Sequence, residues 1–262
     1  MAKADTTKKQ PAIEEEKPEE TTVEFIASMA AVLVTGLFII TFIVQTFVIP
    51  SASMEHTLEV GDHVLVNREQ FAPKTSWMGP LIPYREIHHG DIIVFLHPDP
   101  EYAGTYVVKR VIGIPGDRIH LVNGVVYRNG EALTEPYVNH DQDRPDAYRN
   151  NFPAVPPSEE YEISPDWLTY EPTHVENGEL VVPPGMYFGM GDNRGNSLDS
   201  RYWGFIPREN IIGRPLFIYW SFITPEDQYK QTAWVDQMLF LGHTVIHFFD
   251  QTRWRRTLQV VR

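Results

Sequence analysis

The sequence predicts a mostly β fold that follows a single N-terminal transmembrane helix. Three observations support this fold class in the 262-residue chain. Residues Phe25 to Ile49 form a run of apolar and small residues without a formal charge. Beyond it, short runs of β-branched residues are bounded by Gly, Pro and Asp, as is typical of strands. Asn123-Gly124 lies between two such runs and is a strong hairpin signal.

Residues 1–22 are polar and contain the Glu/Pro-rich stretch "EEEKPEE". A segment of this composition cannot bury enough apolar surface to fold. We expect it to be a disordered tail on the cytoplasmic side.

Residues 23–49 are predicted to be a transmembrane anchor. At 1.5 Å per residue, 25 helical residues extend about 37 Å, which exceeds the roughly 30 Å hydrocarbon core of a bilayer. A buried core helix and a cleaved secretory signal are the alternatives, and the small residues 51–53 imitate a cleavage site. The hydrophobic region of a signal is shorter, about 7–15 residues, so the length favours an uncleaved anchor.

The lysines suggest how the anchor is oriented. Lys8, Lys9 and Lys17 precede it, whereas Arg68 is the one Lys or Arg in the twenty residues that follow. Basic residues favour the cytoplasmic side. We therefore expect a single-pass protein of the cell (inner) membrane with a cytoplasmic N-terminus and an extracytoplasmic, periplasmic catalytic domain.

Residues 50–132 and 181–222 are predicted to form a β-rich core. Its clearest strand signals are "HVLVN" (63–67), "DIIVFL" (91–96) and "TYVVKRVIGI" (105–114). Later strands are expected in "GMYFGMGDN" and "IIGRPLFIYWSF".

Residues 133–180 are rich in Pro, Asp and Asn, and we expect an irregular inserted subdomain. The aspartates there do not have the spacing of an EF-hand calcium loop. Residues 223–262 are predicted to be an amphipathic and basic C-terminal segment. Apolar side chains at helical spacing, from Trp234 to Phe249, precede Arg253, Arg255 and Arg256. This helix either rests on a membrane surface or packs on the domain.

The composition argues against a nucleic-acid partner and excludes cysteine chemistry. A net charge of −13 argues against a nucleic-acid partner, since phosphates would be repelled. The chain has no cysteine, which excludes disulfides, thiolate nucleophiles and cysteine-bound zinc. No metal ion or other cofactor is expected.

A serine turn directly follows the apolar run. Ser53 lies four residues beyond Ile49, and four extended residues reach at most about 14 Å, so it must stay near the membrane surface. A lone serine in a turn is usually only a turn residue. As a nucleophile it would need a base, and one set of candidates is the nearby histidines His56, His63, His88, His89 and His97.

Lys109 is the other candidate base. Strand alternation places it on the face of Val107 and Val111, while Arg110 shares the other face with Val108. Burial without a counter-ion lowers the pKa of a lysine. Moving that pKa from about 10.4 to about 7 corresponds to roughly 4.6 kcal/mol. A lysine that extends from a strand edge into water is the structural alternative.

A third segment, "GDNRGNSLDSRYWG" (191–204), is too polar to be core. Together with residues 49–58 and "YVVKRVIGIPGD" (106–117), it resembles the three conserved boxes of the bacterial type I signal peptidase (leader peptidase) family. The boxes occur in the family's order behind an apolar segment. The resemblance covers roughly residues 25–128 and 181–222.

The resemblance implies a signal-peptidase-like catalytic domain and a membrane-anchored serine endopeptidase that removes signal peptides from exported preproteins. Ser53 would be the nucleophile and Lys109 the general base. Ser51 and the Ser53 backbone N–H would form the oxyanion hole. Ser197 would orient Lys109, and Asp199 and Arg201 would form a supporting ion pair.

Two positions depart from the family pattern. His56 stands where proline is frequent, which could loosen the turn after Ser53. Gly195 stands where aspartate is frequent, which removes a carboxylate near the expected lysine pocket. The alternatives are a self-cleaving Ser/Lys regulator and a catalytically silent, membrane-tethered binding module of the same fold. The expected partners are signal peptides and the lipid bilayer.

Overall fold

The structure is a computed structural model that describes residues 21–71, 84–139, 146–157, 163–225, 228–230 and 233–262. Residues 1–20 of the predicted tail lie outside the described residues. The chain divides into two compact units, Met1–Ile39 and Ile40–Arg262.

The first described element is helix α1, Thr22–Phe38. Thr21 caps it and forms a capping box with Glu24, so two of the unpaired N–H groups at the helix start are satisfied. None of the helix residues is buried. No helix of the described residues is both long and apolar enough to cross a membrane.

The prediction of one continuous helix over residues 23–49 is wrong at its C-terminal end. A π-helical turn, Ile39–Ile43, follows α1, and Val44–Val48 form strand β1 instead of helix. This strand pairs antiparallel with β2, Asp62–Asn67, and Phe47 packs against a buried cluster. Valine and phenylalanine suit a strand as well as a membrane helix, and the partner strand decides between the two.

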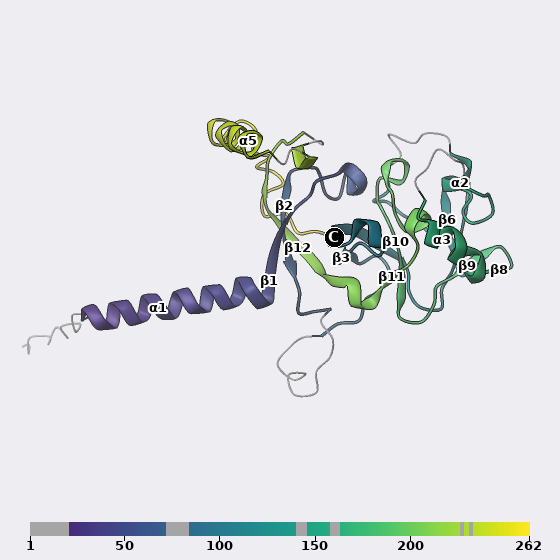
Figure 1. The fold of residues 1–262 in the computed structure, drawn as a ribbon, viewed down its shortest axis with the longest axis horizontal. Helices are drawn as coiled ribbons and strands as arrows, with labels where there is room; N and C mark the ends of the chain where they lie inside the picture. Colours follow the sequence, from purple (N-terminus) through teal and green to yellow (C-terminus); the bar gives the residue numbers. More distant parts are fainter. Residues whose placement is uncertain (1–20, 72–83, 140–145, 158–162, 226–227, 231–232) are drawn as a thin grey trace, which may run out of the picture. The chain divides into compact units, whose positions relative to one another are not determined.

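Seven antiparallel strands form the larger sheet, in the order β1-β2-β12-β3-β4-β10-β11 (Figure 1). The predicted strand runs are confirmed in it. The remaining members are β3 Ile92–Leu96, β4 Tyr106–Gly113, β10 Met186–Met190, β11 Ile206–Pro207 and β12 Ile211–Ser221.

Five shorter strands form a second sheet, in the order β7-β6-β5-β9-β8. The predicted hairpin joins β5 and β6, and Asn123 and Gly124 both have positive φ, 50° and 82°. Residues 175–180, the end of the predicted insertion, extend this sheet together with Val181. Its strands are β5 Arg118–Val122, β6 Val125–Arg128, β7 Glu131–Ala132, β8 Val175–Glu176 and β9 Glu179–Val181.

Short helices connect the strands. The α-helices of the second unit are α2 Ala147–Asn150, α3 Pro165–Tyr170, α4 Ser200–Trp203 and α5 Trp234–Ile246. The 3-10 turns are η2 Ala52–Met54, η3 Pro100–Tyr102, η4 Glu171–His174, η5 Arg194–Asn196, η6 Arg208–Asn210 and η7 Gln228–Lys230. The predicted C-terminal helix is thus present as α5.

Two buried apolar clusters hold these elements together. The larger one joins both sheets and the inserted helices, with Phe95, Phe152 and Phe188 among its members. The smaller one contains Ile49, Met54 and residues of β2, β3 and β12. Because Met54 belongs to this second cluster, it fixes the turn that carries Ser53 to strands β2, β3 and β12.

Candidate active site

The serine turn is held in place by its neighbours. Ala52 and Met54, on either side of Ser53, are both buried. The backbone N–H groups of Thr57 and Leu58 both donate to the Met54 carbonyl and close the turn. Ser53 itself is half-buried, and the exposed Ser51 places its hydroxyl oxygen 3.4 Å from that of Ser53.

His56 has a left-handed backbone, with φ of 77°. Proline fixes φ near about −65° and could not adopt this conformation. A proline at position 56 would therefore require a different backbone conformation from the one seen here. With His56 in place, the hydrogen bonds to the Met54 carbonyl keep the turn closed.

Lys109 lies on β4 and points to Ser53. Its side chain is 3% exposed, and its Nζ lies 2.7 Å from the Ser53 Oγ. Burial lowers the pKa of Lys109 from 10.5 to about 8, against the opposing effect of the Asp199 charge. With this pKa about a tenth of the amines are neutral at pH 7, and a neutral amine can accept a proton from the serine.

Asp199 and Arg201 form the predicted ion pair in the 191–204 segment. Two hydrogen bonds of 2.8 and 2.7 Å join the guanidinium to the carboxylate, and both side chains are buried. Burial raises the pKa of Asp199, but the charge and hydrogen bonds of Arg201, the Lys109 charge and the Gly191 N–H together leave that pKa below its ordinary value. Asp199 also accepts the N–H of Gly191, which connects the ion pair to the loop beside Ser53.

Ser197 is buried in the same loop, but no described residue hydrogen-bonds its Oγ. A Cβ on Gly191 would lie 2.2 Å from that oxygen and 2.4 Å from the Ser53 carbonyl oxygen. Ser197 and Ser53 therefore approach each other across Gly191, and glycine alone leaves room there. The predicted hydrogen bond between Ser197 and Lys109 is not formed in the described structure.

A second buried ion pair supports the site and was not predicted. Arg110 donates to Asp192 through two hydrogen bonds of 2.8 and 2.6 Å, and Thr57 donates to the same carboxylate. The pair links β4, the polar loop and the residues after the serine turn. The alternation that separated Arg110 from Lys109 was a signal for it, since a buried guanidinium requires a partner.

The inserted residues also contact the polar loop. Glu135 pairs with Arg194 of the polar loop through hydrogen bonds of 2.7 and 2.8 Å. The Tyr137 ring lies 3.9 Å from the Arg110 guanidinium carbon, and the Asn139 N–H donates to the Asp192 carbonyl. Sequence reasoning missed these contacts, because an irregular segment has no periodicity that indicates its neighbours.

Three of the five histidines that were considered as bases have other partners in the structure. His89 Nε2 lies 2.6 Å from Asp117, the His97 ring packs on Trp203, and the His63 ring packs on Trp220. Burial lowers the pKa of both His63 and His97. Among the candidate bases, Lys109 is the one with a described hydrogen bond to the Ser53 hydroxyl.

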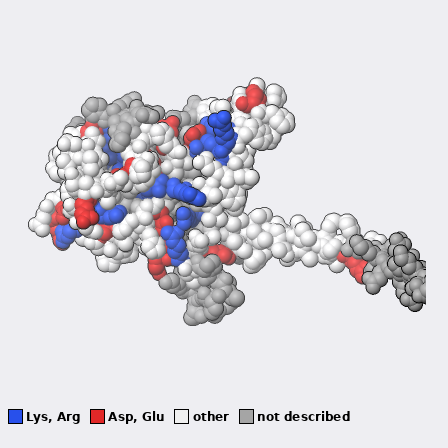
Figure 2. Space-filling view, turned by 180° about the vertical axis from the view of Figure 1, so that it is seen from behind, with Lys and Arg blue, Asp and Glu red and all other residues white. Residues whose placement is uncertain are grey.

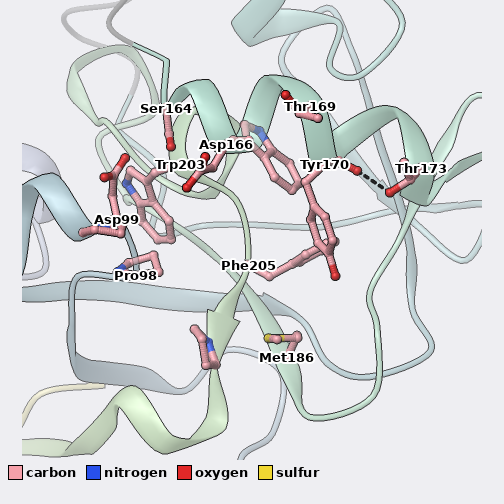
Figure 3. A pocket seen from close by; sticks show the side chains of 13 residues that line it. Pro98, Asp99, Ser164, Asp166, Thr169, Tyr170, Thr173, Met186, Trp203 and Phe205 are labelled. Atoms are coloured by element: carbon pink, nitrogen blue, oxygen red, sulfur yellow. Dashed lines mark hydrogen bonds between the residues drawn. The ribbon is translucent and has the colours of Figure 1, made fainter.

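A cavity of about 670 Å³ lies beside α4 and is separate from the Ser53–Lys109 pair (Figure 3). Aromatic side chains of Trp203, Phe205 and Tyr170 line it, and neither Ser53 nor Lys109 contributes to its wall. Trp167 and Tyr148 connect this side of the domain to the polar loop, since both donate hydrogen bonds to the Arg201 carbonyl.

Comparisons with known proteins agree with these features. A family model described as "Signal peptidase, peptidase S26" matches residues 22–220. The chain is 34% identical to a signal peptidase I of Aquifex aeolicus, covering 82% of this chain and 92% of that protein. It is 34% identical to a signal peptidase I of Pseudomonas fluorescens, with 82% and 78% covered.

A probable signal peptidase I-2 of Synechocystis sp. is 32% identical, with 79% of this chain and 77% of that protein covered. A crystal structure of a signal peptidase I from Enterococcus faecalis aligns with a TM-score of 0.36 and 32% identity, and covers 50% of this chain and 97% of that chain.

Proposed function

Since the chain belongs to the signal peptidase family, peptidase S26, and is a serine endopeptidase that removes signal peptides from preproteins, we propose that Ser53 is its nucleophile and Lys109 its general base. The 2.7 Å distance between the Ser53 Oγ and the buried Lys109 Nζ carries this proposal. A pKa of about 8 gives the lysine access to its neutral form.

The reaction follows from this pair. Neutral Lys109 accepts the hydroxyl proton while the Ser53 Oγ attacks the carbonyl carbon of the scissile peptide bond. The ammonium then donates its proton to the leaving amine, and an acyl-enzyme ester remains on Ser53. Lys109, neutral again, takes a proton from a water molecule that attacks the ester. The ammonium then returns this proton to the Ser53 Oγ as the bond between the Oγ and the acyl carbon breaks, which frees the serine and the acid product.

The Ser51 hydroxyl and the Ser53 backbone N–H are proposed to stabilise the oxyanion of the tetrahedral intermediate. Ser51 is exposed beside the nucleophile, where a bound peptide can reach it. A donor aimed at the developing charge contributes about 2.7–4 kcal/mol in comparable sites.

Three residues of the polar loop are proposed to position the base. The Asp199–Arg201 pair keeps the wall of the lysine pocket charge-balanced, and its hydrogen bond to Gly191 fixes the loop. Ser197 is buried next to Gly191 with an unsatisfied hydroxyl oxygen. Such a group commonly gains a partner when an active site is occupied. We propose that it orients Lys109 in the substrate complex.

The location of the enzyme is also a proposal. Helix α1 carries no Lys or Arg and leaves its apolar side chains exposed, which supports a membrane anchor there. The lysines that precede this segment favour a cytoplasmic N-terminus. The catalytic domain would then act outside the cytoplasm on preproteins at the membrane surface.

Cleavage of a preprotein with an Ala-x-Ala site by the full, detergent-purified chain tests the dyad. Ser53→Ala and Lys109→Met should each abolish cleavage that the parent performs, while both variants keep the parent's circular dichroism spectrum. Cleavage that survives Lys109→Met would refute the role of the lysine. A parent that cleaves nothing where another signal peptidase I is active would leave a binding module as the better function.

A further inference from the structure

The cavity beside α4 is a concave site that the proposed reaction does not use (Figure 3). Its volume of about 670 Å³ lies within the range of about 300–1,000 Å³ that is usual for small-molecule sites. The segment after β3, helix α3 and the ends of α4, β10 and β11 supply its walls. Because Ser53 and Lys109 do not line it, a ligand held there would leave the catalytic pair free.

Aromatic rings form much of the wall and are held by their neighbours. Trp167 packs edge-on against Phe205, with ring centroids 5.2 Å apart, and both side chains are buried. Trp203 packs on Phe95 of the core, with ring centroids 5.7 Å apart. Tyr170 is exposed beside them. The wall is therefore preformed and apolar, as is typical of ligand sites.

The charges in the cavity wall are all of one sign. Asp99 and Asp166 both line the cavity, and the described residues that line it include no Lys, Arg or His. The Asp99 carboxylate accepts a backbone N–H from Glu101 at the start of η3, which fixes its position. His97 lies next to Trp203, but burial lowers its pKa, which favours its neutral form. Neither carboxylate thus has a counter-ion in the wall.

This composition differs from that of the outer surface. On the face that Figure 2 shows, Lys and Arg lie interspersed with Asp and Glu over the catalytic domain. Within the cavity, Asp99, Asp166 and Trp203 gather at one end, and Tyr170 and Phe205 lie toward the other (Figure 3). One end is therefore acidic and aromatic, and the other is apolar.

Such a site selects a ligand by charge. A cation is attracted by both carboxylates and by the face of a tryptophan ring, which is the strongest aromatic partner of a cation. An anion is repelled, and a neutral ligand gains apolar contact alone. The apolar end requires that the cation also carries a hydrocarbon or aromatic body.

A small molecule fits better than an extended peptide. A peptide that joins a sheet edge needs free N–H and C=O groups along that edge. The edge strand here, β11, has two residues, and one of them, Pro207, has no N–H to donate. The cavity wall thus lacks the hydrogen-bond donors that would hold a peptide backbone.

We propose that this cavity binds a small organic cation, an ammonium or guanidinium group on an apolar body. The charged group lies at the end with Asp99, Asp166 and Trp203, and the body lies against Tyr170 and Phe205. The Trp167 Nε1–H donates to the Arg201 carbonyl across 3.0 Å, so the cavity wall adjoins the Asp199–Arg201 pair. The binding itself involves no proposed catalytic residue and does not rest on the proposed function.

Three probes with the same body test the selectivity. Phenylbutylammonium, phenylbutanol and phenylbutyrate carry a positive charge, no charge and a negative charge at neutral pH. Isothermal titration calorimetry on the full, detergent-purified chain gives their dissociation constants, with titrations into detergent alone subtracted. The ammonium should bind about tenfold more tightly than the alcohol, and the carboxylate most weakly. Equal binding of the three probes would overturn the proposal.

Two matched double variants locate the site. Asp99→Asn/Asp166→Asn should remove the preference, so that the ammonium and the alcohol bind alike. Glu131→Gln/Asp236→Asn removes two charges outside the cavity and should keep the preference. If the first variant loses the parent's circular dichroism spectrum, Asp166→Asn replaces it, because this side chain is exposed, and should weaken ammonium binding about two- to fivefold. A preference that either cavity variant leaves unchanged would refute the site.

Competition separates the cavity from the catalytic groove. A peptide with an Ala-x-Ala site should not displace the ammonium from the Ser53→Ala chain, and displacement would overturn the proposal. Binding of an acetyl-Lys-Phe-amide peptide without binding of phenylbutylammonium would also overturn it, because a protein segment would then be the occupant. Since binding is measured without cleavage, a chain that binds the ammonium but cleaves no preprotein would refute the proposed function and leave this inference intact.

Discussion

Lys109 and Arg110 are neighbours on β4 whose side chains point to opposite faces of the strand, and each is 3% exposed. Arg110 meets the Asp192 carboxylate through two hydrogen bonds. Lys109 forms no ion pair with any described carboxylate and instead meets the Ser53 hydroxyl. Two buried cations one residue apart are therefore placed in opposite electrostatic situations.

The difference shows how one strand can supply both a base and a structural support. An arginine stays charged when buried, so it needs a counter-ion, and Asp192 supplies one. A lysine can release its proton instead, and burial lowers the pKa of Lys109 to about 8. The ion pair of Arg110 with Asp192 fixes the polar loop, and Lys109, which forms no ion pair with a described carboxylate, provides the proton acceptor.

The largest effect is expected when Lys109 is replaced by a cation that cannot become neutral. Lys109→Arg should lower the cleavage rate by about 10⁴–10⁶-fold, the range typical of losing one member of a catalytic unit. Initial rates on a preprotein measure this loss. Arg110→Lys is the reciprocal control and should remain active, because the charge beside Asp192 is kept. A Lys109→Arg variant within about tenfold of the parent rate would contradict the role of a neutral amine.

Removal of the counter-ion on the other face should act on stability. Asp192→Asn leaves the Arg110 charge buried without its partner, which typically costs about 3–5 kcal/mol. Urea unfolding of the variant and the parent measures the difference. The double variant Asp192→Leu/Arg110→Met should recover much of this loss, because no charge then stays buried. A loss that the double variant does not reduce would argue against an unpaired charge as the cause.

Gly191 precedes Asp192 and lies close to the Ser53 carbonyl, so we expect that no side chain is tolerated at position 191. Gly191→Ala would place a Cβ 2.4 Å from the Ser53 carbonyl oxygen, so the loop or the serine turn must move. Displacements near 1 Å cost about 10²-fold in rate. Gly242→Ala on α5 is the control, since nothing lies within 4 Å of its Cβ position. Equal kcat values for the two variants would show that the close approach is unimportant.

A smaller effect should separate a buried pair from an exposed one. Glu135→Gln removes the charge that holds Arg194, both partners being at most 9% exposed, and should cost about 1.5–3 kcal/mol. Glu176→Gln breaks an equally short pair with Arg118 that is 61% exposed on the glutamate side, and should cost about 0–1 kcal/mol. Urea unfolding compares them. A reversed order would mean that the Glu135–Arg194 pair does not brace the loop.

The candidate site was predictable through the family resemblance more than through any single residue. Ser53 and Lys109 taken alone left a turn serine and a strand-edge lysine as alternatives, and the resemblance of three segments together pointed to Ser53, Lys109 and the Asp199–Arg201 pair. The partnership of Arg110 with Asp192 joins residues far apart in the chain, and no local pattern encodes it. For the same reason, the contacts of Glu135 and Tyr137 could not be predicted.

The fold was predictable where periodicity was clear. Alternating runs and Asn123-Gly124 located the main strands and one hairpin. Residues 44–48 were assigned to the helix because they continue the uncharged run that begins at Phe25. Taken alone, a short apolar run fits a helix and a buried strand equally well. The hydrogen bonds of β1 to β2 settle that choice, and they depend on residues some twenty positions later.

The pH dependence of kcat/KM tests most directly whether a neutral Lys109 is the base. Only the neutral form accepts the serine proton, so activity should be lost as the pH falls through the lysine pKa. With a pKa of about 8, kcat/KM should decrease about tenfold per pH unit below that value and level off above it. A profile that is flat through pH 8, or that bends near the ordinary histidine pKa of about 6.5, would contradict Lys109 as the base.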